Sequence, residues 1–414
     1  MGYIYYMWEI KEPLIYYKSS ESMNEVKDNS IQLIITSPPY GKIKNYETES
    51  QIGYFDSFNE YFNRLATVWK ECYRVLEPHC RMVINVGDQY LRAKDFGRYR
   101  IESISSKIIS DCLVIGFDYL GDVIWQKVST TNTTGGCSLM GSIYYPRNGL
   151  FTYDYEHVLI FKRVEGQKRK IDRKVKEMSK IPLSEWKKWF VGHWKIPGIL
   201  QKEHVAMFPE EIPYRLIRMF SFIGDTVLDP FLGSGTSLKI AKALFRNGIG
   251  YEINEDYRDV IENKIKDPKP ILDYQYLLYW LYKLSESGEF RILYELQKQK
   301  GIIFLEDKDN NKIIIDYLLV DQENLEDKKE VLLNELNLKF EENSFQNYMD
   351  GKDIWKEMKN YVLILNIISS NFSKNDLVSL MKSEIIRTYK KTIKIITLND
   401  LIKKQSIKFL FLES

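Results

Sequence analysis

A serine and a tyrosine flank two prolines in the sequence Ser37-Pro38-Pro39-Tyr40. The apolar run at 31–35 predicts a buried strand, and the prolines end it because each fixes φ and lacks an N–H. The motif would therefore form a stiff turn at the carboxyl end of a strand, where open α/β sheets bind ligands. A hydroxyl, backbone carbonyls and a flat ring suit a planar group with an N–H donor, such as the amine of a flipped nucleobase. The motif alone fits a proline-stiffened loop equally well.

A glycine-rich loop at 229–236, with the sequence Asp-Pro-Phe-Leu-Gly-Ser-Gly-Thr, follows a second apolar strand. It opens a predicted helix over 238–245. Glycines permit close backbone approach to a ligand, and a helix N-terminus offers free N–H groups. A third predicted strand, at 248–253, contains Glu252, which lies 23 positions after Asp229. At that βαβ spacing a carboxylate binds ribose hydroxyls.

The Ser-Pro-Pro-Tyr turn and the loop at 229–236 together resemble the motifs of DNA amino-methyltransferases that use S-adenosylmethionine. The catalytic motif comes first, an order similar to the β-type permutation of that family, and the resemblance covers roughly residues 15–262. It implies an α/β fold, with a Rossmann-like methyltransferase sheet and a permuted motif order. It also implies methyl transfer to an exocyclic amine of double-stranded DNA.

The resemblance implies roles for the catalytic turn. The Ser37 hydroxyl and the Pro38 carbonyl would accept N–H bonds from the target amine. Pro39 belongs to the same turn, and Tyr40 would stack on the flipped base. Serine at the first position favours cytosine N4, because adenine enzymes of the family more often have Asp or Asn there. Adenine N6 is the alternative, and the lack of a Pro-Cys dipeptide argues against carbon-5 methylation.

The resemblance also implies a set of cofactor-binding residues. Asp229 would lie near the methionine amine of S-adenosylmethionine, and Glu252 would bind its ribose. A His-x-Ala-x-Phe-Pro element at 204–209 is similar to a family segment that packs beside the cofactor. The implied residues are Asp229, Pro230, Phe231, Gly233, Ser234, Gly235, Thr236, Glu252, Phe208 and Pro209.

Other functional classes remain open at this point. They are a methyltransferase acting on RNA or on protein amides, a bifunctional restriction–modification chain, and a DNA-binding protein without catalysis. For a DNA methyltransferase of this type, a cognate restriction endonuclease acting on the same site would be a partner. The oligomeric state cannot be inferred from the sequence.

Cysteine usage and hydropathy limit the cellular setting. None of the four cysteines forms a CxxC pair, so we predict no metal site and no disulfide framework. A reducing cytoplasm fits this pattern. The first 17 residues lack the basic start and long apolar core of a signal peptide, and no apolar run is long enough to span a membrane.

Charge is uneven along a chain whose formal net charge is only +2. Residues 162–203 hold thirteen Lys and Arg against five Asp and Glu, with Trp186, Trp189 and Trp194 interleaved. Basic and aromatic side chains together are suited to gripping an opened duplex, and the resemblance implies a target-recognition segment here. The alternative is a basic surface subdomain with a small tryptophan core. Residues 301–353 are acidic, with six Lys against fourteen Asp and Glu.

A proline-rich linker at 267–270 divides the predicted domains. We expect a methyltransferase domain over 1–266 and a C-terminal α+β or α/β module over 271–414, used for DNA recognition or oligomerisation. In that module we predict helices at 272–284, 290–298 and 374–390, and strands at 302–305, 313–320, 361–367 and 393–397. Asp316 and the run Glu335-Leu336-Asn337 leave a metal-dependent nuclease open, although Asn337 stands where such a core has lysine.

Periodicity predicts the remaining elements of the first domain. Apolar residues at helical spacing predict a helix over 58–76, ended by Pro78. We expect the polar loop at 41–53 to close over DNA and the aperiodic stretch at 129–149 to face it, with plain exposure or disorder as the alternatives. The other predicted elements are strands at 15–17, 81–88, 117–127 and 155–161, and helices at 101–115, 210–222 and 257–265.

Overall fold

The chain divides into two compact units in the computed structural model, one formed by Met1–Lys176 and Trp189–Pro270, the other by Glu177–Lys188 and Ile271–Ser414. Each is described by itself below. The residues that the structure describes are 10–41, 48, 50–128, 140–141, 147, 149–151, 153–198, 208–266, 268, 271, 273–285, 288, 290–292, 302–307, 312–320, 360–367 and 392–397.

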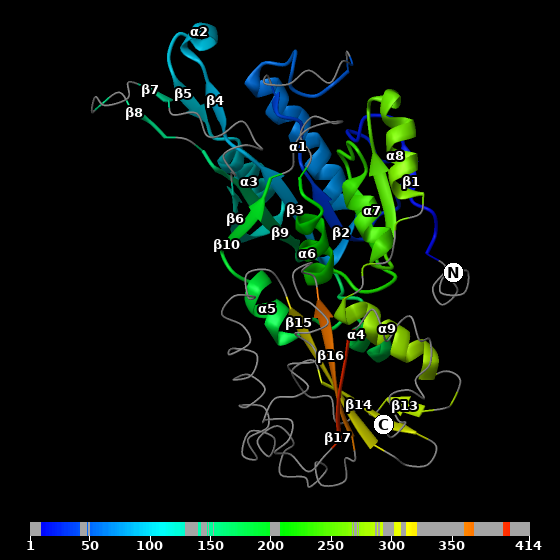
Figure 1. Ribbon diagram of the computed structural model, residues 1–414. Coiled ribbons are helices and arrows are strands. Elements are labelled where there is room, and N and C mark those ends of the chain that lie inside the picture. Colours follow the sequence, from blue (N-terminus) through cyan, green and yellow to red (C-terminus); the bar gives the residue numbers. More distant parts are fainter. Residues whose placement is uncertain are drawn as a thin grey trace. The chain divides into compact units, whose positions relative to one another are not determined.

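The first unit is built on an eight-stranded sheet, counted over its described residues (Figure 1). One strand, β9, runs antiparallel to both of its neighbours, and the other pairings are parallel. The predicted α/β fold is therefore confirmed. In spatial order the strands are β1 (Leu14–Tyr16), β12 (Asn247–Tyr251), β11 (Thr226–Asp229), β2 (Ile31–Thr36), β3 (Leu76–Val86), β9 (Tyr155–Arg163), β6 (Phe117–Val128) and β10 (His193–Pro197).

Helices cover this sheet. The longest, α1, starts with a capping box in which Ser57 and Glu60 bond each other's backbone N–H, and it buries Tyr61, Leu65 and Trp69 at helical spacing. It packs beside α3, whereas α7 packs beside α6 and α8. The bounds are α1 (Phe58–Val75), α3 (Ile104–Ile115), α6 (Glu211–Phe220), α7 (Thr236–Ala243), α8 (Arg258–Ile265) and the 3-10 turn η2 (Glu255–Tyr257).

The strand predicted at 81–88 is longer than expected, because β3 begins at Leu76. Pro78 lies inside it, although proline cannot donate to a ladder. The β2–β3 register shifts between Ile31 and Leu33, which leaves the stretch around Pro78 out of the pairing, and His79 has a φ of 67°. An irregularity of this kind accommodates both residues.

The carboxyl ends of β2 and β11 lie side by side. Val227 pairs with Leu33 and Leu228 with Ile34. From β11 the chain passes through α7 to β12, and from β2 it passes through α1 to β3 on the other side. Such a switch in direction leaves a crevice at the ends of the two strands, and this is where doubly wound sheets bind ligands.

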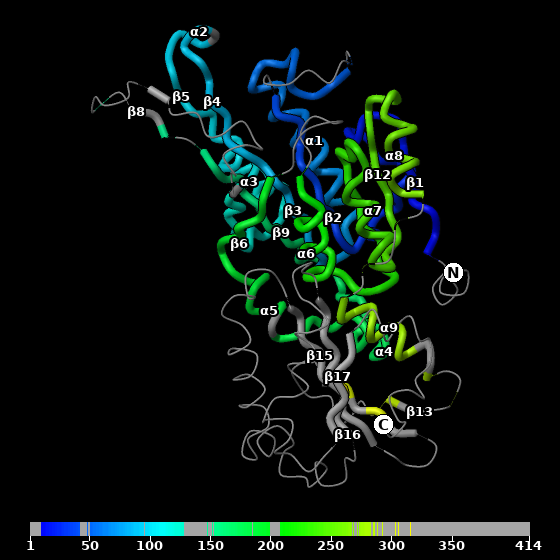
Figure 2. The backbone as a smooth tube through the Cα atoms, viewed as in Figure 1, coloured from blue at the N-terminus to red at the C-terminus, as the bar shows by residue number. Residues whose placement is uncertain are grey.

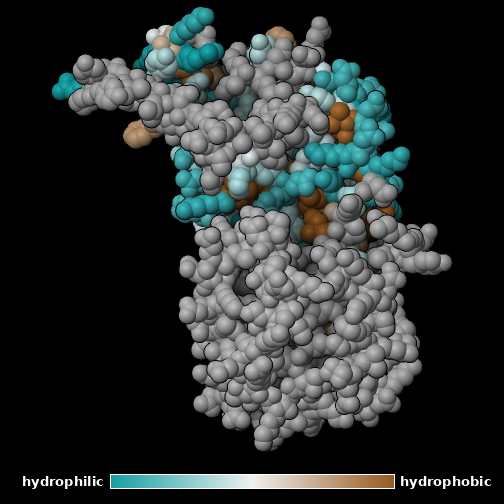
Figure 3. Space-filling view, in the orientation of Figure 1, coloured by the Kyte–Doolittle hydropathy of each residue, from teal (hydrophilic) through white to brown (hydrophobic). Residues whose placement is uncertain are grey.

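A hairpin, β4 with β5, projects from the end of the sheet and carries α2 at its tip (Figures 1 and 2). Because residues 100–102 pair in this hairpin, the helix predicted from 101 begins at Ile104 instead. Hydrophilic side chains gather over α2 and over α8 in the space-filling view (Figure 3). The remaining elements of the first unit are β4 (Gln89–Leu91), α2 (Ala93–Phe96), β5 (Arg100–Glu102), β7 (Met140–Gly141) and β8 (Gly149–Leu150). The helix α4 (Arg173–Met178) ends in the second unit, and nearly all of α5 (Leu183–Trp189) belongs to it.

The second unit contains a five-stranded mixed sheet and the helix α9 (Tyr274–Ser285) within its described residues. Four of these strands were predicted. The helix predicted at 290–298 is wrong at its start, since residues 290–292 pair antiparallel with β14, and pairing with a neighbour overrides local propensity. The predicted helix at 374–390 and Glu335–Asn337 lie outside the described residues. The strands are β13 (Phe290–Ile292), β14 (Ile302–Asp307), β15 (Lys312–Val320), β16 (Asn360–Ile367) and β17 (Thr392–Thr397).

None of the helices in the described ranges combines the length and the apolar character needed to cross a bilayer.

Candidate active site

A buried hydrogen bond joins the two sequence motifs. Thr36, the last residue of β2, donates from Oγ1 to Oδ1 of Asp229, the last residue of β11, over 2.7 Å. Both side chains are almost inaccessible to solvent. The bond fixes the Ser37–Tyr40 turn against the glycine-rich loop, although 193 positions separate its two residues.

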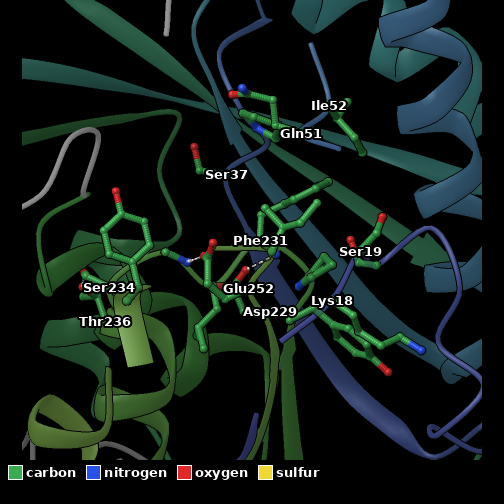
Figure 4. Close-up of a pocket in the computed structure, with 18 of the residues that line it drawn as sticks. Lys18, Ser19, Ser37, Gln51, Ile52, Asp229, Phe231, Ser234, Thr236 and Glu252 are labelled. Atoms are coloured by element: carbon green, nitrogen blue, oxygen red, sulfur yellow. Dashed lines mark hydrogen bonds between the residues drawn. The ribbon is translucent and has the colours of Figure 1, made fainter. Parts of the chain in front are cut away.

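A cavity that is partly open to solvent lies at these strand ends (Figure 4). In this close-up, Ser37 lies on one side of Asp229 and Glu252, and Ser234 and Thr236 on another. Ten of the predicted site residues line the cavity: Ser37, Pro39, Phe208, Asp229, Pro230, Phe231, Gly233, Ser234, Thr236 and Glu252.

Four predicted site residues are not in that lining. Pro38 is buried beneath the turn. Tyr40 is half-buried, and its hydroxyl donates to Glu156 Oε1 over 3.2 Å. Pro209 lies just before α6, where its carbonyl accepts from the Ile212 N–H. Gly235 is the N-cap of α7, with a φ of 85° that favours glycine, and it supports the loop without facing the cavity.

The turn at 37–40 has one carbonyl that is engaged and one hydroxyl that has no partner among the described residues. The Pro39 carbonyl accepts from the Tyr61 hydroxyl over 2.8 Å and from the Gly41 N–H over 2.9 Å. The Ser37 hydroxyl has no hydrogen-bond partner among the described residues, and it lines the cavity. The turn is therefore held by Pro39 and leaves Ser37 available to a ligand.

Asp229 is bonded on both oxygens. Beyond Thr36, it accepts from the Phe231 N–H over 3.0 Å and from the Ser237 hydroxyl. Complete burial outweighs these bonds and raises the pKa of its carboxyl to about 6. The side chain thus shapes the loop and also lines the cavity.

Glu252 grips the other end of the same loop. Its Oε2 accepts from the Gly233 N–H over 2.8 Å, and its Oε1 accepts from the Asn254 N–H over 2.9 Å. Burial raises the pKa of this carboxyl to about 7, with a smaller contribution from the nearby Asp229 charge. Gly233 has a φ of 55°, so the bond to Glu252 depends on a conformation that favours glycine.

Lys264 was missed by the sequence reasoning. From α8 it donates to the Ser234 hydroxyl over 2.8 Å and to the Thr236 hydroxyl over 2.7 Å. These bonds hold the loop at the start of α7. Lys264 lies 28 positions after Thr236, so no local spacing in the sequence indicates the contact. Lys264 is not in the cavity lining; the lining residues that were not predicted are Lys18, Ser19, Ser20, Gln51, Ile52, Leu232, Tyr251, Ile253 and Tyr257.

Two of the three tryptophans of the basic segment lie in the interior of the protein. Trp189 and Trp194 are buried, and the Trp194 indole donates to the Trp189 carbonyl. These two rings are packing residues and offer no face for stacking. On β9, His157 Nδ1 lies 2.8 Å from Oδ2 of the Asp122 carboxylate.

Parts of the predicted DNA-facing surface cannot be placed. Residues 42–47, 129–139 and 142–146 lie outside the described residues. Over the ranges that are described, no three His, Cys, Asp or Glu side chains are grouped so as to hold a metal ion.

Comparison with known proteins identifies similar chains. The sequence model of the DNA methylase family matches residues 31–263. The chain is 36% identical over 279 residues to the type II methyltransferase M.MjaI of Methanocaldococcus jannaschii, covering 61% of this chain and 90% of that one. It is 34% identical over 277 residues to M.MthZI of Methanothermobacter thermautotrophicus, covering 61% and 76%.

A solved structure is similar in fold as well as in sequence. It is a putative DNA modification methylase from Thermus thermophilus, complexed with S-adenosyl-L-methionine. The TM-score is 0.51 at 30% identity, and the match covers 62% of this chain and 95% of that one.

Proposed function

Since the chain belongs to the DNA methylase family, we propose that it methylates the exocyclic N4 of a flipped cytosine in double-stranded DNA, protecting that site from a cognate restriction endonuclease. The chain is a DNA methyltransferase of the restriction–modification type. The observation that carries the proposal is the Thr36–Asp229 bond, which holds the free Ser37 hydroxyl and the glycine-rich loop at one cavity.

The methyl donor is S-adenosylmethionine, and the cavity has the chemistry to hold it. When bound, this cofactor supplies an electrophilic methyl group on a positively charged sulfur. Glu252 uses one lone pair on each oxygen for backbone N–H groups, so it retains acceptors for ribose hydroxyls. Asp229 already accepts three bonds of about four that a carboxylate can take, which leaves one acceptor for the methionine amine. The rings of Phe208, Phe231 and Tyr257 supply apolar wall for a purine.

The target amine is a poor nucleophile because its lone pair is delocalised into the base ring. Ser37 and the Pro38 carbonyl accept its two N–H groups and so direct the lone pair toward the donor side of the cavity. The Pro39 carbonyl is already bonded to Tyr61 and Gly41, and the family resemblance gives the role of the second acceptor to the Pro38 carbonyl. Most of the acceleration then comes from positioning and from fixed dipoles.

The choice of cytosine rests on Ser37, because adenine enzymes of the family more often have Asp or Asn at this position. Methylation of adenine N6 by the same atoms is the alternative. Residues 1–266 form the methyltransferase domain in this proposal, with 162–203 as its basic target-recognition segment. Residues 271–414 act as a further module in DNA recognition or oligomerisation.

Base-resolved modification sequencing of plasmid DNA tests the proposal, using a host that expresses the chain and a Ser37→Ala variant as the control. N4-methylcytosine at a single short motif, absent with the variant, is the expected result. N6-methyladenine there would keep the mechanism and overturn the choice of base. No modification by a soluble protein that binds S-adenosylmethionine would contradict DNA methylation.

A further inference from the structure

A buried carboxylate outside the predicted site holds the tyrosine of the catalytic turn. Glu156 is only 6% exposed. Its Oε1 accepts from the Tyr40 hydroxyl over 3.2 Å and also from the Lys127 ammonium, and its Oε2 accepts from the Asn85 amide over 2.6 Å. The three donors come from the turn after β2, from β3 and from β6, so this one side chain joins three elements.

Strand direction explains why these groups meet beside the site. Parallel strands β2, β3 and β6 end at the same edge of the sheet, and β9, which is antiparallel, begins there with Glu156 as its second residue. Asn85 pairs with Val158, and Trp125 pairs with Glu156. A Cβ added at Gly87 would lie 3.3 Å from Glu156 Cγ, so the chain leaving β3 packs closely against this side chain.

The charge of Glu156 is compensated and anchored. An unpaired carboxylate at this depth would cost several kcal/mol, and Lys127 supplies the opposite charge. The Lys127 ammonium also lies 5.2 Å from the centre of the Trp125 ring, and the Trp125 indole donates to the Ile196 carbonyl of β10. Backbone ladders already join β3, β9 and β6, so the sheet does not need this arrangement in order to pair.

We propose that Glu156 is a positioning residue that fixes the ring of Tyr40 for stacking on the flipped base, with Asn85 and Lys127 holding Glu156 in turn. The inference rests on the proposed function of the turn. A ring tethered by its hydroxyl loses the freedom to rotate before DNA arrives, so less ordering is required when the base enters. Glu156 itself does not touch the base or the methyl donor.

A double-mutant cycle tests this assignment, with cofactor affinity and thermal unfolding measured on every variant. We expect Glu156→Ala and Tyr40→Phe each to lower kcat for DNA methylation by roughly 10-fold, consistent with loss of positioning by a group outside the reaction. The double variant is expected to be no worse than either single variant, because both act through one bond. Cofactor affinity is expected to stay at the wild-type value throughout.

Glu156→Gln is the matched rescue. Its amide oxygen still accepts from Tyr40, and Asn85 Oδ1, which is buried without a hydrogen-bond partner, can accept from the new amide once the Asn85 side chain turns over. We expect kcat within about 3-fold of wild type, even though the charge is lost.

Four outcomes would overturn the inference: additive losses in the cycle, a Glu156→Gln variant as impaired as Glu156→Ala, a Tyr40→Phe variant with wild-type kcat, or a loss of cofactor affinity with Glu156→Ala. If Glu156→Ala does not fold, Tyr40→Phe and Glu156→Gln still decide the question. An inactive wild-type protein would instead contradict the proposed function, and the inference would fall with it.

Discussion

The carboxylates in the lining of the cavity and the carboxylate beside it are held in opposite ways. On the donor side, formed by the loop at 229–236 and Glu252, acceptors are satisfied mainly by nearby backbone N–H and hydroxyl groups. On the target side, formed by the turn at 37–40 and Glu156, the carboxylate is bound by side chains from distant parts of the chain. Apart from the Thr36 bond, the carboxylates of the donor side are thus held from within residues 229–254, whereas the target side draws its donors from the turn after β2, from β3 and from β6.

The difference extends to the counter-charge of each carboxylate. No cation is bonded to Asp229 or Glu252 among the described residues, and burial raises the pKa of both carboxyls, to about 6 and about 7. Glu156, by contrast, has the Lys127 ammonium on its Oε1. The donor side is therefore in a position to gain from a positively charged ligand, whereas the target side already has its counter-charge and serves to hold a ring in place.

The largest expected effect comes from removing the free hydroxyl on the target side. Ser37→Ala should lower kcat by about 10² to 10³, because an acceptor aimed at the reacting amine is lost. The affinity for S-adenosylmethionine should not change, since the donor side is untouched. Radiolabelled methyl transfer and calorimetry measure the two quantities. Ser110→Ala, on the exposed face of α3, is the matched control, and equal activity of both variants would disprove the role of Ser37.

The next largest effect should follow from breaking the bond between the two sides. Thr36→Val keeps the shape of the side chain but leaves Asp229 Oδ1 with a single donor. We expect the free energy of unfolding to fall by about 2 kcal/mol, as for a buried hydrogen bond to a charged group. Urea denaturation measures it, with Thr67→Val on the exposed face of α1 as the control. A difference within the error of the control would show that the two sides are joined by packing alone.

A smaller effect is expected from adding a methyl group in the tightly packed region beneath the donor loop. A Cβ at Gly250 would lie 2.7 Å from a methyl group of Leu232, the residue before Gly233. Gly250→Ala should displace the loop and weaken S-adenosylmethionine binding by about 10-fold, which corresponds to about 1.4 kcal/mol and lies within the usual cost of overpacking. At Gly192 the same substitution meets nothing within 4 Å, so Gly192→Ala is the control. Calorimetric titration of both variants should separate them, and unchanged affinity at Gly250 would mean that the loop adjusts freely.

The smallest expected effect is a fractional proton release on cofactor binding. The pKa of Glu252 is raised to about 7 in the free protein, and accepting ribose hydroxyls favours its ionised form. Affinity should therefore rise with pH between about 6 and 8. The contribution of Glu252 to the free energy of unfolding of the free protein should show the opposite trend. It is fully present below the usual carboxyl pKa and is lost as pH rises through about 7.

Titrations in two buffers of different ionisation enthalpy count the released protons. Glu252→Gln should abolish the release, whereas Glu255→Gln, on the exposed turn η2, should leave it unchanged. If the Glu252→Gln variant still releases protons when the cofactor binds, the protons come from another group.

The same contrast explains what the sequence could predict. Asp229, Gly233 and Glu252 belong to one βαβ stretch, so spacing and family resemblance identified them, and the structure places all three on the cavity. Lys264 and Glu156 were missed because each reaches its partners across at least 28 positions, with no periodic signal to mark it. The helix predicted at 290–298 is wrong at residues 290–292 for the same reason. Pairing with β14 decides the conformation there, and no local pattern encodes that partner.

Strand order has a consequence for synthesis of the chain. Strands β2, β3, β6 and β9 all lie within residues 31–163, so the target side can pair early. In space, however, β12 and β11 lie between β1 and β2, although they are the last strands of this sheet to be made. A nascent chain that stops short of β11 therefore exposes the apolar edge of β2, which a second nascent chain could pair with. When β11 and β12 pair between β1 and β2, they complete the cofactor cavity and at the same time cover the exposed edge of β2.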